Sequence, residues 1–460
     1  MAYHEWLAAL LIAGALRHTG AQPKIIPVET VAAYAQQGAP IRIGVAQYAR
    51  AVKLLPQARA TVALEMGGTS SSFNLGAGKS VMAHLDGDHI LVNGPAGPAR
   101  CLSVTLRSAS PVRVFSWGAE TRRSRRTGTG IHRGDIEIVR DAGGTLSAVC
   151  VLPLESYLPG VVSAEMPVRF RAEALKAQAI IARTYALFNL GKHASQGFDL
   201  CDGVHCQQYR GVVHLPHVAA AVTATKGQVL AYRGCLAETV YHAVCGGFVD
   251  EPYRVWDGYL VPYLRAAADD PGSRQEAIPD AAREEDVARL VASASSSYCA
   301  GSPRYRWSRS YSLAEAQHLV DANLPVLMGV EGPLGRLMDM TAEGRSPGGR
   351  VQSLRIVTDI GEFEVKRNNI RWLFGDGKPG PDGLPSTLFR LRVERDGAGG
   401  ASKFVFSGAG WGHGLGLCQY GANGRAGAGW SADEILRFYY PGTAVVDLAR
   451  GMPGGRNGNN

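Results

Sequence analysis

The alternation of apolar and polar residues predicts a strand-rich first third of the chain. Residues 41–46 alternate as a first strand, and further short β-like runs are separated by turns that contain Gly, Pro, Asp and Asn. These runs lie at residues 61–64, 89–92, 112–115, 136–139 and 146–152. We therefore expect the folded body to begin near residue 41, after a linker or lead-in helix at 23–40.

The pattern becomes helical after Glu165. Pro167 lacks an amide hydrogen and has a preset φ angle, so it suits the first turn of a helix. Apolar residues then recur at roughly helical spacing from Ala174 to Phe188, in a segment rich in alanine. The sequence therefore predicts a helix that begins just after Glu165 and holds this carboxylate rigidly against the core.

The rest of the chain mixes helical and strand-like segments. Residues 217–226 and 313–322 predict helices, residues 228–232 predict a strand, and residues 351–395 alternate again. The fold class that we expect is a mixed, strand-rich α+β protein with one main domain. In chain order the predicted parts are a signal peptide (1–22), a linker (23–40), a catalytic domain (41–447) with a polar insertion (268–300), and a Gly/Asn-rich disordered tail (448–460).

Composition agrees with this organisation and narrows the partners. The chain of 460 residues is 46% hydrophobic, which is ample for a sizeable core, and 57 glycines favour many turns. The net charge is +8, with one dense basic group at Arg122, Arg123, Arg125 and Arg126. No nucleic-acid-reading motif accompanies these arginines, so we expect a solvated loop and no nucleic acid partner. An anionic cell envelope would attract the same charge.

The N-terminus predicts export. Residues 6–16 form an apolar run that is too short to span a bilayer comfortably, and small residues follow it, as in a signal peptide. His4 and Glu5 stand where Lys or Arg is usual, so a mis-assigned start or a buried N-terminal helix would explain the run equally well. We expect a protein of the periplasm or extracellular cell envelope, with no transmembrane segment after signal removal.

Two of the eight cysteines are close in sequence and suggest a metal site. Cys201 and Cys206 are separated by four residues, within the range of zinc sites, and His193 and His205 are nearby. Either histidine qualifies as a third zinc ligand, and His193 is preferred because adjacent residues such as His205 and Cys206 ligate together less easily. A disulfide or two free thiols are the alternatives.

A glycine-rich block near the C-terminus is the second candidate site. Six glycines occur in the 14 residues 408–421, and they permit close approach of backbone and side chains to a ligand. Within this block, Trp411 offers a stacking surface and His413, Gln419 and Tyr420 offer polar contacts to a substrate. The alternative for His413 is a hydrogen-bonded core residue.

Several motifs in order resemble those of the stage II sporulation protein D (SpoIID/LytB) family. The first is Leu-Pro-Leu-Glu-Ser-Tyr-Leu at 152–158, followed by Val-Val-Ser-Ala-Glu-Met-Pro at 161–167 and Ala-Arg-Thr-Tyr-Ala-Leu at 182–187. A Cys-Gly-Gly turn at 245–247 and the glycine-rich block follow, so the resemblance covers about residues 41–447. It implies a SpoIID-type α+β fold and a peptidoglycan lytic transglycosylase.

The resemblance also implies roles for the candidate residues. The family's catalytic glutamate stands in the Glu-Met-Pro context of Glu165, which would act as the single general acid and base and leave 1,6-anhydro ends on peptidoglycan glycan strands. Zinc on two cysteines and a histidine near the active site is also a family feature. The expected helix N-terminus would lower the pKa of Glu165, so burial has to outweigh it.

Two other functions remain open. The first is a non-catalytic peptidoglycan-binding protein or amidase enhancer that acts with other cell-wall hydrolases. The second is a zinc hydrolase whose metal-bound water does the chemistry at 201–206. The enhancer predicts no product from isolated glycan, and the zinc hydrolase predicts chelator sensitivity and hydrated ends.

Overall fold

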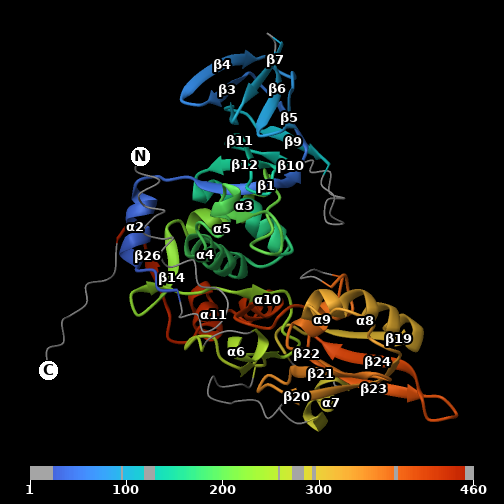
Figure 1. The fold of residues 1–460 in the computed structure, drawn as a ribbon. Coiled ribbons are helices and arrows are strands. Elements are labelled where there is room, and N and C mark those ends of the chain that lie inside the picture. Colours follow the sequence, from blue (N-terminus) through green and yellow to red (C-terminus); the bar gives the residue numbers. More distant parts are fainter. Residues whose placement is uncertain are drawn as a thin grey trace.

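A computed structural model describes residues 24–94, 97–118, 130–256, 260–271, 284–292, 297–377 and 382–450. The predicted signal peptide, the arginine group at 122–126 and residues 451–460 lie outside these ranges. The described part is a strand-rich α+β structure. Figure 1 shows strands at the N-terminal end, a central helical layer, and a further sheet region beside the C-terminal helices. Among the described helices, none is both long and apolar enough to cross a membrane.

Two antiparallel sheets form the N-terminal part, and all six predicted strands are confirmed within them. Strand β13 is the exception to the antiparallel order, since it runs parallel to β1. The seven-stranded sheet contains β13 (Leu200–Cys201), β1 (Ile41–Ala49), β12 (Leu146–Leu152), β11 (Asp135–Arg140), β8 (Ser103–Arg107), β3 (Ala60–Met66) and β4 (Thr69–Leu75). The six-stranded sheet contains β10 (Gly130–His132), β9 (Val112–Trp117), β2 (Ala51–Pro56), β5 (Val81–Asp86), β6 (His89–Gly94) and β7 (Gly97–Cys101).

The predicted start of the helix after Glu165 is wrong. Glu165 is the last residue of helix α3 (Leu154–Glu165), and the alanine-rich helix α4 (Ala172–Phe188) begins only after a turn that contains Pro167. Helix α4 is buried along most of its length and packs against α3 and α5 (Pro216–Ala224). The long helix does follow the carboxylate, but Glu165 lies at a helix C-terminus.

Helix α3 escapes the sequence pattern because it contains Pro159 and Gly160. A Cβ atom at Gly160 would lie 2.5 Å from the ring of Tyr209, so this glycine permits the 209–211 loop to pack directly on the helix. At the other end of α3, the buried Arg183 of α4 holds Glu155 at 2.7 Å. The helix is thus fixed by tertiary contacts rather than by its own propensity.

A second hydrophobic cluster lies in the region 306–406, apart from the main core. The predicted helix at 313–322 is confirmed as α8, which begins with a capping box between Ser312 and Glu315. The elements here are β19 (Arg306–Ser312), α8 (Leu313–Met328), β20 (Leu337–Arg345), β21 (Val351–Thr358), β22 (Gly361–Lys366), α9 (Asn369–Leu373), β23 (Phe389–Arg395) and β24 (Ala401–Ala409). Of the predicted 268–300 insertion, the structure describes 268–271, α7 (Glu284–Ala292) and 297–300.

The chain then returns to the main core. The glycine-rich block follows β24 and leads into β25 (Leu417–Cys418), which pairs in parallel with β16 (Tyr241–His242). Helices α10 (Gln419–Gly427) and α11 (Ala432–Tyr439) pack on α4. Strands β15 (Cys235–Leu236), β14 (Gln228–Tyr232) and β26 (Ala444–Asp447) close a small sheet beside the lead-in helix α2 (Val28–Gln36). Short elements complete the fold: η2 (Ala194–Gln196), β17 (Phe248–Val249), α6 (Pro252–Val255) and β18 (Ala267–Ala268).

Candidate functional site

The carboxylate of Glu165 is half-buried at the C-terminal end of α3. Its Oε1 accepts a hydrogen bond from the backbone N–H of Gln208 at 2.7 Å. Burial raises the pKa of Glu165 above its ordinary value, and this outweighs the Gln208 N–H and the side chains of Tyr241 and Gln419, which lower it. The carbonyl groups at the end of α3 also disfavour a negative charge. The sequence predicts a helix N-terminus at Glu165, which would lower its pKa. Because the residue lies at a helix C-terminus instead, the helix and the burial both raise this pKa.

A buried polar chain, missed by the sequence analysis, backs the carboxylate. The hydroxyl of Tyr157 donates to Gln207 Oε1 at 3.3 Å, and Gln207 Nε2 donates to the Tyr241 hydroxyl at the same distance. Because the Tyr241 oxygen already accepts a hydrogen bond, its own proton is left to face Glu165, whose pKa it lowers. The only sequence signal for Gln207 and Gln208 was their position directly after Cys206.

The parallel pairing of β25 with β16 brings two predicted residues to this region. Gln419 follows β25, is 4% exposed, and lowers the pKa of Glu165. Tyr420 is half-buried, and its ring contacts Phe170 edge to face at 5.0 Å between centroids. Gln419 therefore lies at the carboxylate, and the Tyr420 ring packs against Phe170 in the turn between α3 and α4.

The remaining predicted residues of the glycine-rich block have partners within the protein. The Arg304 guanidinium lies over the Trp411 ring, 4.0 Å from the ring centroid, as a cation–π contact. His413 Nε2 donates to the Tyr241 carbonyl at 2.8 Å, and its Nδ1 accepts from the Leu415 N–H at 3.1 Å. Burial lowers the pKa of His413 to about 3, so the ring is neutral. His413 thus ties the block to β16, and its role in lining the substrate site stays a prediction.

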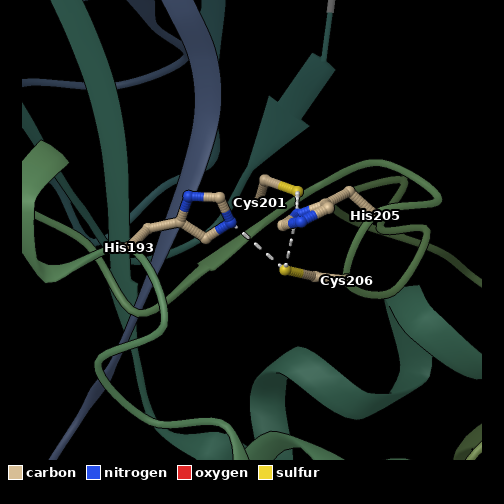
Figure 2. Close-up of side chains that lie close together, drawn as sticks. All are labelled: His193, Cys201, His205 and Cys206. Atoms are coloured by element: carbon tan, nitrogen blue, oxygen red, sulfur yellow. Dashed lines mark hydrogen bonds between the residues drawn. The ribbon is translucent and has the colours of Figure 1, made fainter. Parts of the chain in front are cut away.

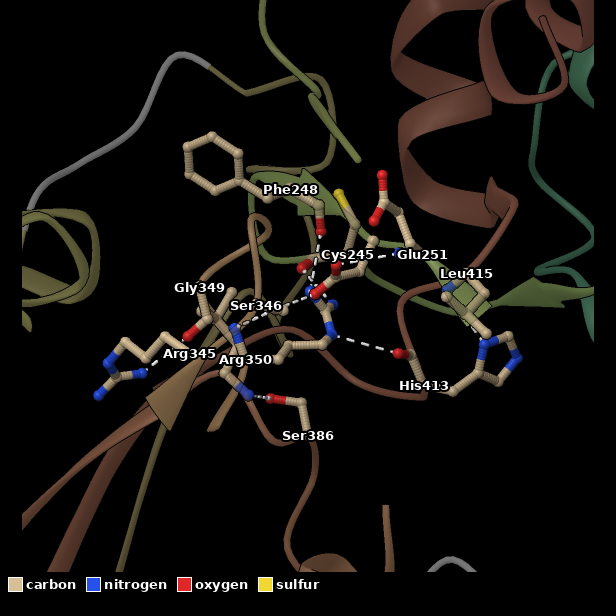
Figure 3. Close-up of polar contacts among 12 residues, drawn as sticks. Cys245, Phe248, Glu251, Arg345, Ser346, Gly349, Arg350, Ser386, His413 and Leu415 are labelled. Carbon is tan, nitrogen blue, oxygen red and sulfur yellow. Dashed lines mark hydrogen bonds and ion pairs between the residues drawn. The ribbon is translucent and has the colours of Figure 1, made fainter. Parts of the chain in front are cut away.

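Arg350, which follows the β20–β21 turn, holds the same block from the other side (Figure 3). Its guanidinium is fully buried and donates to the carbonyl of His413 at 3.1 Å and to those of Phe248 and Cys245 at 3.2 Å. Gly414 has a positive φ of 82°, and a Cβ there would collide with this guanidinium. The second hydrophobic cluster is thereby linked to the candidate site.

The four predicted metal-site residues come together beside β1 (Figure 2). The donor atoms of His193, Cys201, His205 and Cys206 all lie within 4.8 Å of one another. Cys206 Sγ is 3.4 Å from His193 Nε2 and 3.6 Å from His205 Nδ1, and Cys201 Sγ is 3.8 Å from the same Nδ1. Both histidines lie at the sulfurs, so the structure offers His193 and His205 together as ligands and gives no reason to choose between them.

This donor set fits zinc. Tetrahedral Zn²⁺ with bonds of about 2.0–2.3 Å places its ligand atoms roughly 3.3–3.8 Å apart, close to the distances here. His193 Nδ1 contacts Gln196 Oε1 at 2.7 Å, which places the proton on Nδ1 and leaves the Nε2 lone pair toward Cys206. The hydrogen bond from Cys206 and the two imidazoles lower the pKa of the Cys201 thiol. The group could hold a metal ion.

Comparisons with known proteins agree with these motifs. A family model described as stage II sporulation protein matches residues 142–232, and one described as a domain of unknown function (DUF8618) matches residues 250–416. An amidase enhancer of Bacillus subtilis (strain 168) is 30% identical over 315 residues, which cover 63% of this chain and 40% of that protein. The stage II sporulation protein D of the same organism is 26% identical over 312 residues, covering 64% of this chain and 75% of that protein. An uncharacterized protein of Brachyspira hyodysenteriae is 28% identical over 308 residues, covering 66% and 70%.

Proposed function

Because the chain belongs to the stage II sporulation protein D (SpoIID) family, we propose that it is a cell-wall lytic transglycosylase with Glu165 as its single general acid and base. The family supports a role at the cell wall. The proposed substrate is the bond between N-acetylmuramic acid and N-acetylglucosamine in peptidoglycan glycan strands. The proposal includes export, since this polymer lies outside the cytoplasm.

The half-buried carboxylate of Glu165 carries the proposal. Burial and the end of α3 favour the protonated form, which is the form that a general acid needs. The Gln208 N–H and the nearby side chains of Tyr241 and Gln419 stabilise the carboxylate once the proton has left. One side chain is therefore prepared for both protonation states, as successive acid and base steps require.

In the first step, protonated Glu165 donates its proton to the glycosidic oxygen, and the bond from that oxygen to the anomeric carbon of muramic acid breaks. In the second step, the Glu165 carboxylate accepts the proton of the muramic 6-hydroxyl while O6 bonds to the same anomeric carbon. The product has a 1,6-anhydro ring, no water is consumed, and Glu165 is protonated again.

An intramolecular nucleophile removes the need for a second catalytic carboxylate, which hydrolysing glycosidases normally use. The two carboxylates closest to this region in sequence are engaged in ion pairs of their own. Glu155 contacts Arg183, and Glu173 contacts Lys176, each at 2.7 Å. This supports a mechanism with one carboxylate.

The Cys/His cluster would act as a structural metal site. Cys201, Cys206, His193 and His205 would hold zinc, and four protein ligands complete its tetrahedron, whereas a catalytic zinc needs an open position. When bound, the ion would supply a rigid cross-link within the 193–206 loop. Because Gln208 follows this loop directly and its N–H contacts Glu165, a rigid loop would help to position the carboxylate. The four protein ligands leave no open position for a zinc-activated water.

The test uses purified glycan strands, with and without stem peptides, analysed by mass spectrometry. Wild-type protein is expected to release 1,6-anhydro ends, and Glu165→Gln is expected to release none, because it cannot donate or accept the proton. Glu173→Gln is the matched control and should keep activity, since this carboxylate pairs with Lys176.

Two outcomes would overturn the proposal. Hydrated ends would point to hydrolysis instead of transglycosylation. No cleavage of any strand by the wild type would favour the second candidate, an amidase enhancer, which the name of the Bacillus subtilis relative supports. In that case, added amidase should act faster in the presence of wild-type protein and of Glu165→Gln alike.

A further inference from the structure

A second group of cysteines lies in the core and includes Cys418 of the glycine-rich block. Cys245, Cys299 and Cys418 meet Asp269, and the four donor atoms lie within 4.8 Å of one another. Cys245 Sγ is 3.4 Å from Cys299 Sγ and 3.2 Å from Asp269 Oδ2. All four residues are fully buried, and they come from four separate parts of the chain.

The carboxylate of Asp269 is oriented toward the sulfurs by its other partners. Its Oδ1 accepts hydrogen bonds from Arg425 Nη2 and from the Tyr439 hydroxyl, each at 2.9 Å. Oδ2 is then left facing Cys245. A carboxylate that is fixed through one oxygen and presents the other to a group of thiols has the arrangement of a metal ligand with an outer partner.

Backbone N–H groups point at the sulfurs. Cys418 Sγ accepts from the N–H groups of Cys245 and Gly421 at 3.2 Å, and Cys245 Sγ accepts from Gly247 at 3.4 Å. Cys418 is also the N-cap of α10, where the helix dipole stabilises a negative charge. Sulfur accepts such bonds best as a thiolate, which is the metal-binding form.

We propose that Cys245, Cys299, Cys418 and Asp269 bind a zinc ion as a second, structural metal site. Three thiolates and a carboxylate complete a tetrahedron, and a buried site with four protein ligands is typical of structural zinc. The excess negative charge of such a site is offset in part by two buried guanidinium groups, of which Arg350 also pairs with Asp250 at 3.9 Å. Arg425 pairs with Asp269, and Arg350 donates to the Cys245 carbonyl.

This ion would fix the side of the candidate site that Gln419 and Tyr241 form, as distinct from the side formed by Gln207 and Gln208. Gln419, which faces Glu165, is the residue after Cys418, and Tyr241 lies on the strand paired with β25. The Cys-Gly-Gly turn is packed so closely on the block that a Cβ at Gly246 would lie 2.8 Å from Gly410 N. The site joins segments up to 173 residues apart in sequence.

The first test counts bound Zn²⁺ in the full chain, purified under reducing conditions and dialysed against metal-free buffer. We expect about two ions per wild-type chain and about one in the double variant Cys201→Ser/Cys206→Ser. One ion in the wild type and none in the double variant would overturn the proposal. A disulfide between Cys245 and Cys299 in unreduced peptides from the purified protein would also overturn it.

Cobalt gives a second readout that does not depend on changing the buried residues. The double variant keeps all three proposed thiolates, so the same variant produced in zinc-depleted medium supplemented with Co²⁺ is expected to show a thiolate-to-cobalt charge-transfer band. The absence of this band would overturn the proposal. Cys299→Ser should lose one Zn²⁺, whereas Cys101→Ser should keep both, because Cys101 is equally buried but lies outside both groups.

Discussion

Each of the two cysteine groups lies next in sequence to a glutamine at the candidate catalytic residue, but the two groups are built differently. In each, a cysteine is followed by a glutamine near Glu165: Gln207 and Gln208 follow Cys206, and Gln419 follows Cys418. The first group closes a local loop, and its His205 is exposed to solvent. The second is fully buried and joins four distant segments. We infer that the first group tunes the site and that the second stabilises the whole fold.

The largest expected effect is on stability, from a change in the buried group. Cys299→Ser removes a ligand that ties distant segments, and such a loss costs about 4 kcal/mol, or roughly 10 °C in melting temperature. The reason is that a long-range cross-link restricts the unfolded chain more than a local one does. Thermal unfolding followed by circular dichroism measures the shift.

The local group provides the comparison for this experiment. Cys201→Ser/Cys206→Ser should lower the melting temperature by only a few degrees, about a third of the effect of Cys299→Ser. Cys101→Ser controls for placing a buried hydroxyl in the core. If the local double variant destabilises the protein as much as Cys299→Ser does, the inferred division between the groups is wrong.

The next effect is on activity, from a change in the local group. Cys206→Ser loosens the loop that presents the Gln208 N–H to Glu165, so we expect the release of anhydro ends to fall by about 10–100-fold. The fall should appear in kcat rather than in KM, because the loop positions the acid. Mass spectrometry of the released ends at several strand concentrations measures both constants.

A thiol outside both groups is the control for that loss. Cys235→Ser changes a half-buried cysteine on β15 and should leave the rate unchanged. A chelator should reproduce the Cys206→Ser effect in the wild type. A rate that is insensitive to both treatments would separate the local group from catalysis.

Local patterns predicted much of this architecture. Strands with alternating apolar residues were found because one face of each is buried, as in β6 and β11. The helix start failed because Pro167 is compatible with both a helix and a turn. Helix α3 was missed because Pro159 and Gly160 serve the packing of Tyr209, which is not visible in a local window.

The same limit applies to the candidate site. Cys201, Cys206 and their histidines are at most 13 positions apart in sequence, so spacing alone suggested a cluster. Cys245 and Cys418 were not paired from the sequence, because only the tertiary fold brings such distant segments together. Tyr241 was missed for the same reason, since its contact with Gln207 crosses 34 residues.

Tyr241 gives the finest test of the comparison, because it is connected to the segments that follow both cysteine groups. Its hydroxyl accepts from Gln207, and its strand pairs with the segment that contains Cys418. Tyr241 lowers the pKa of Glu165, so Tyr241→Phe should raise this pKa further. Glu165 acts first in its protonated form, and the rate falls as pH rises through its pKa. The alkaline limb of the pH–rate profile should therefore move to higher pH.

A structural role alone would lower the rate without moving that limb. Tyr185→Phe is the matched control, since its ring lies 6.4 Å from that of Tyr241 and its hydroxyl accepts from Lys192. An unshifted limb in Tyr241→Phe would mean that the two sides position Glu165 but do not set its proton affinity. A shift in Tyr241→Phe alone would mean that they meet in one hydrogen-bonded unit, through which either cysteine group can act on the proton of Glu165.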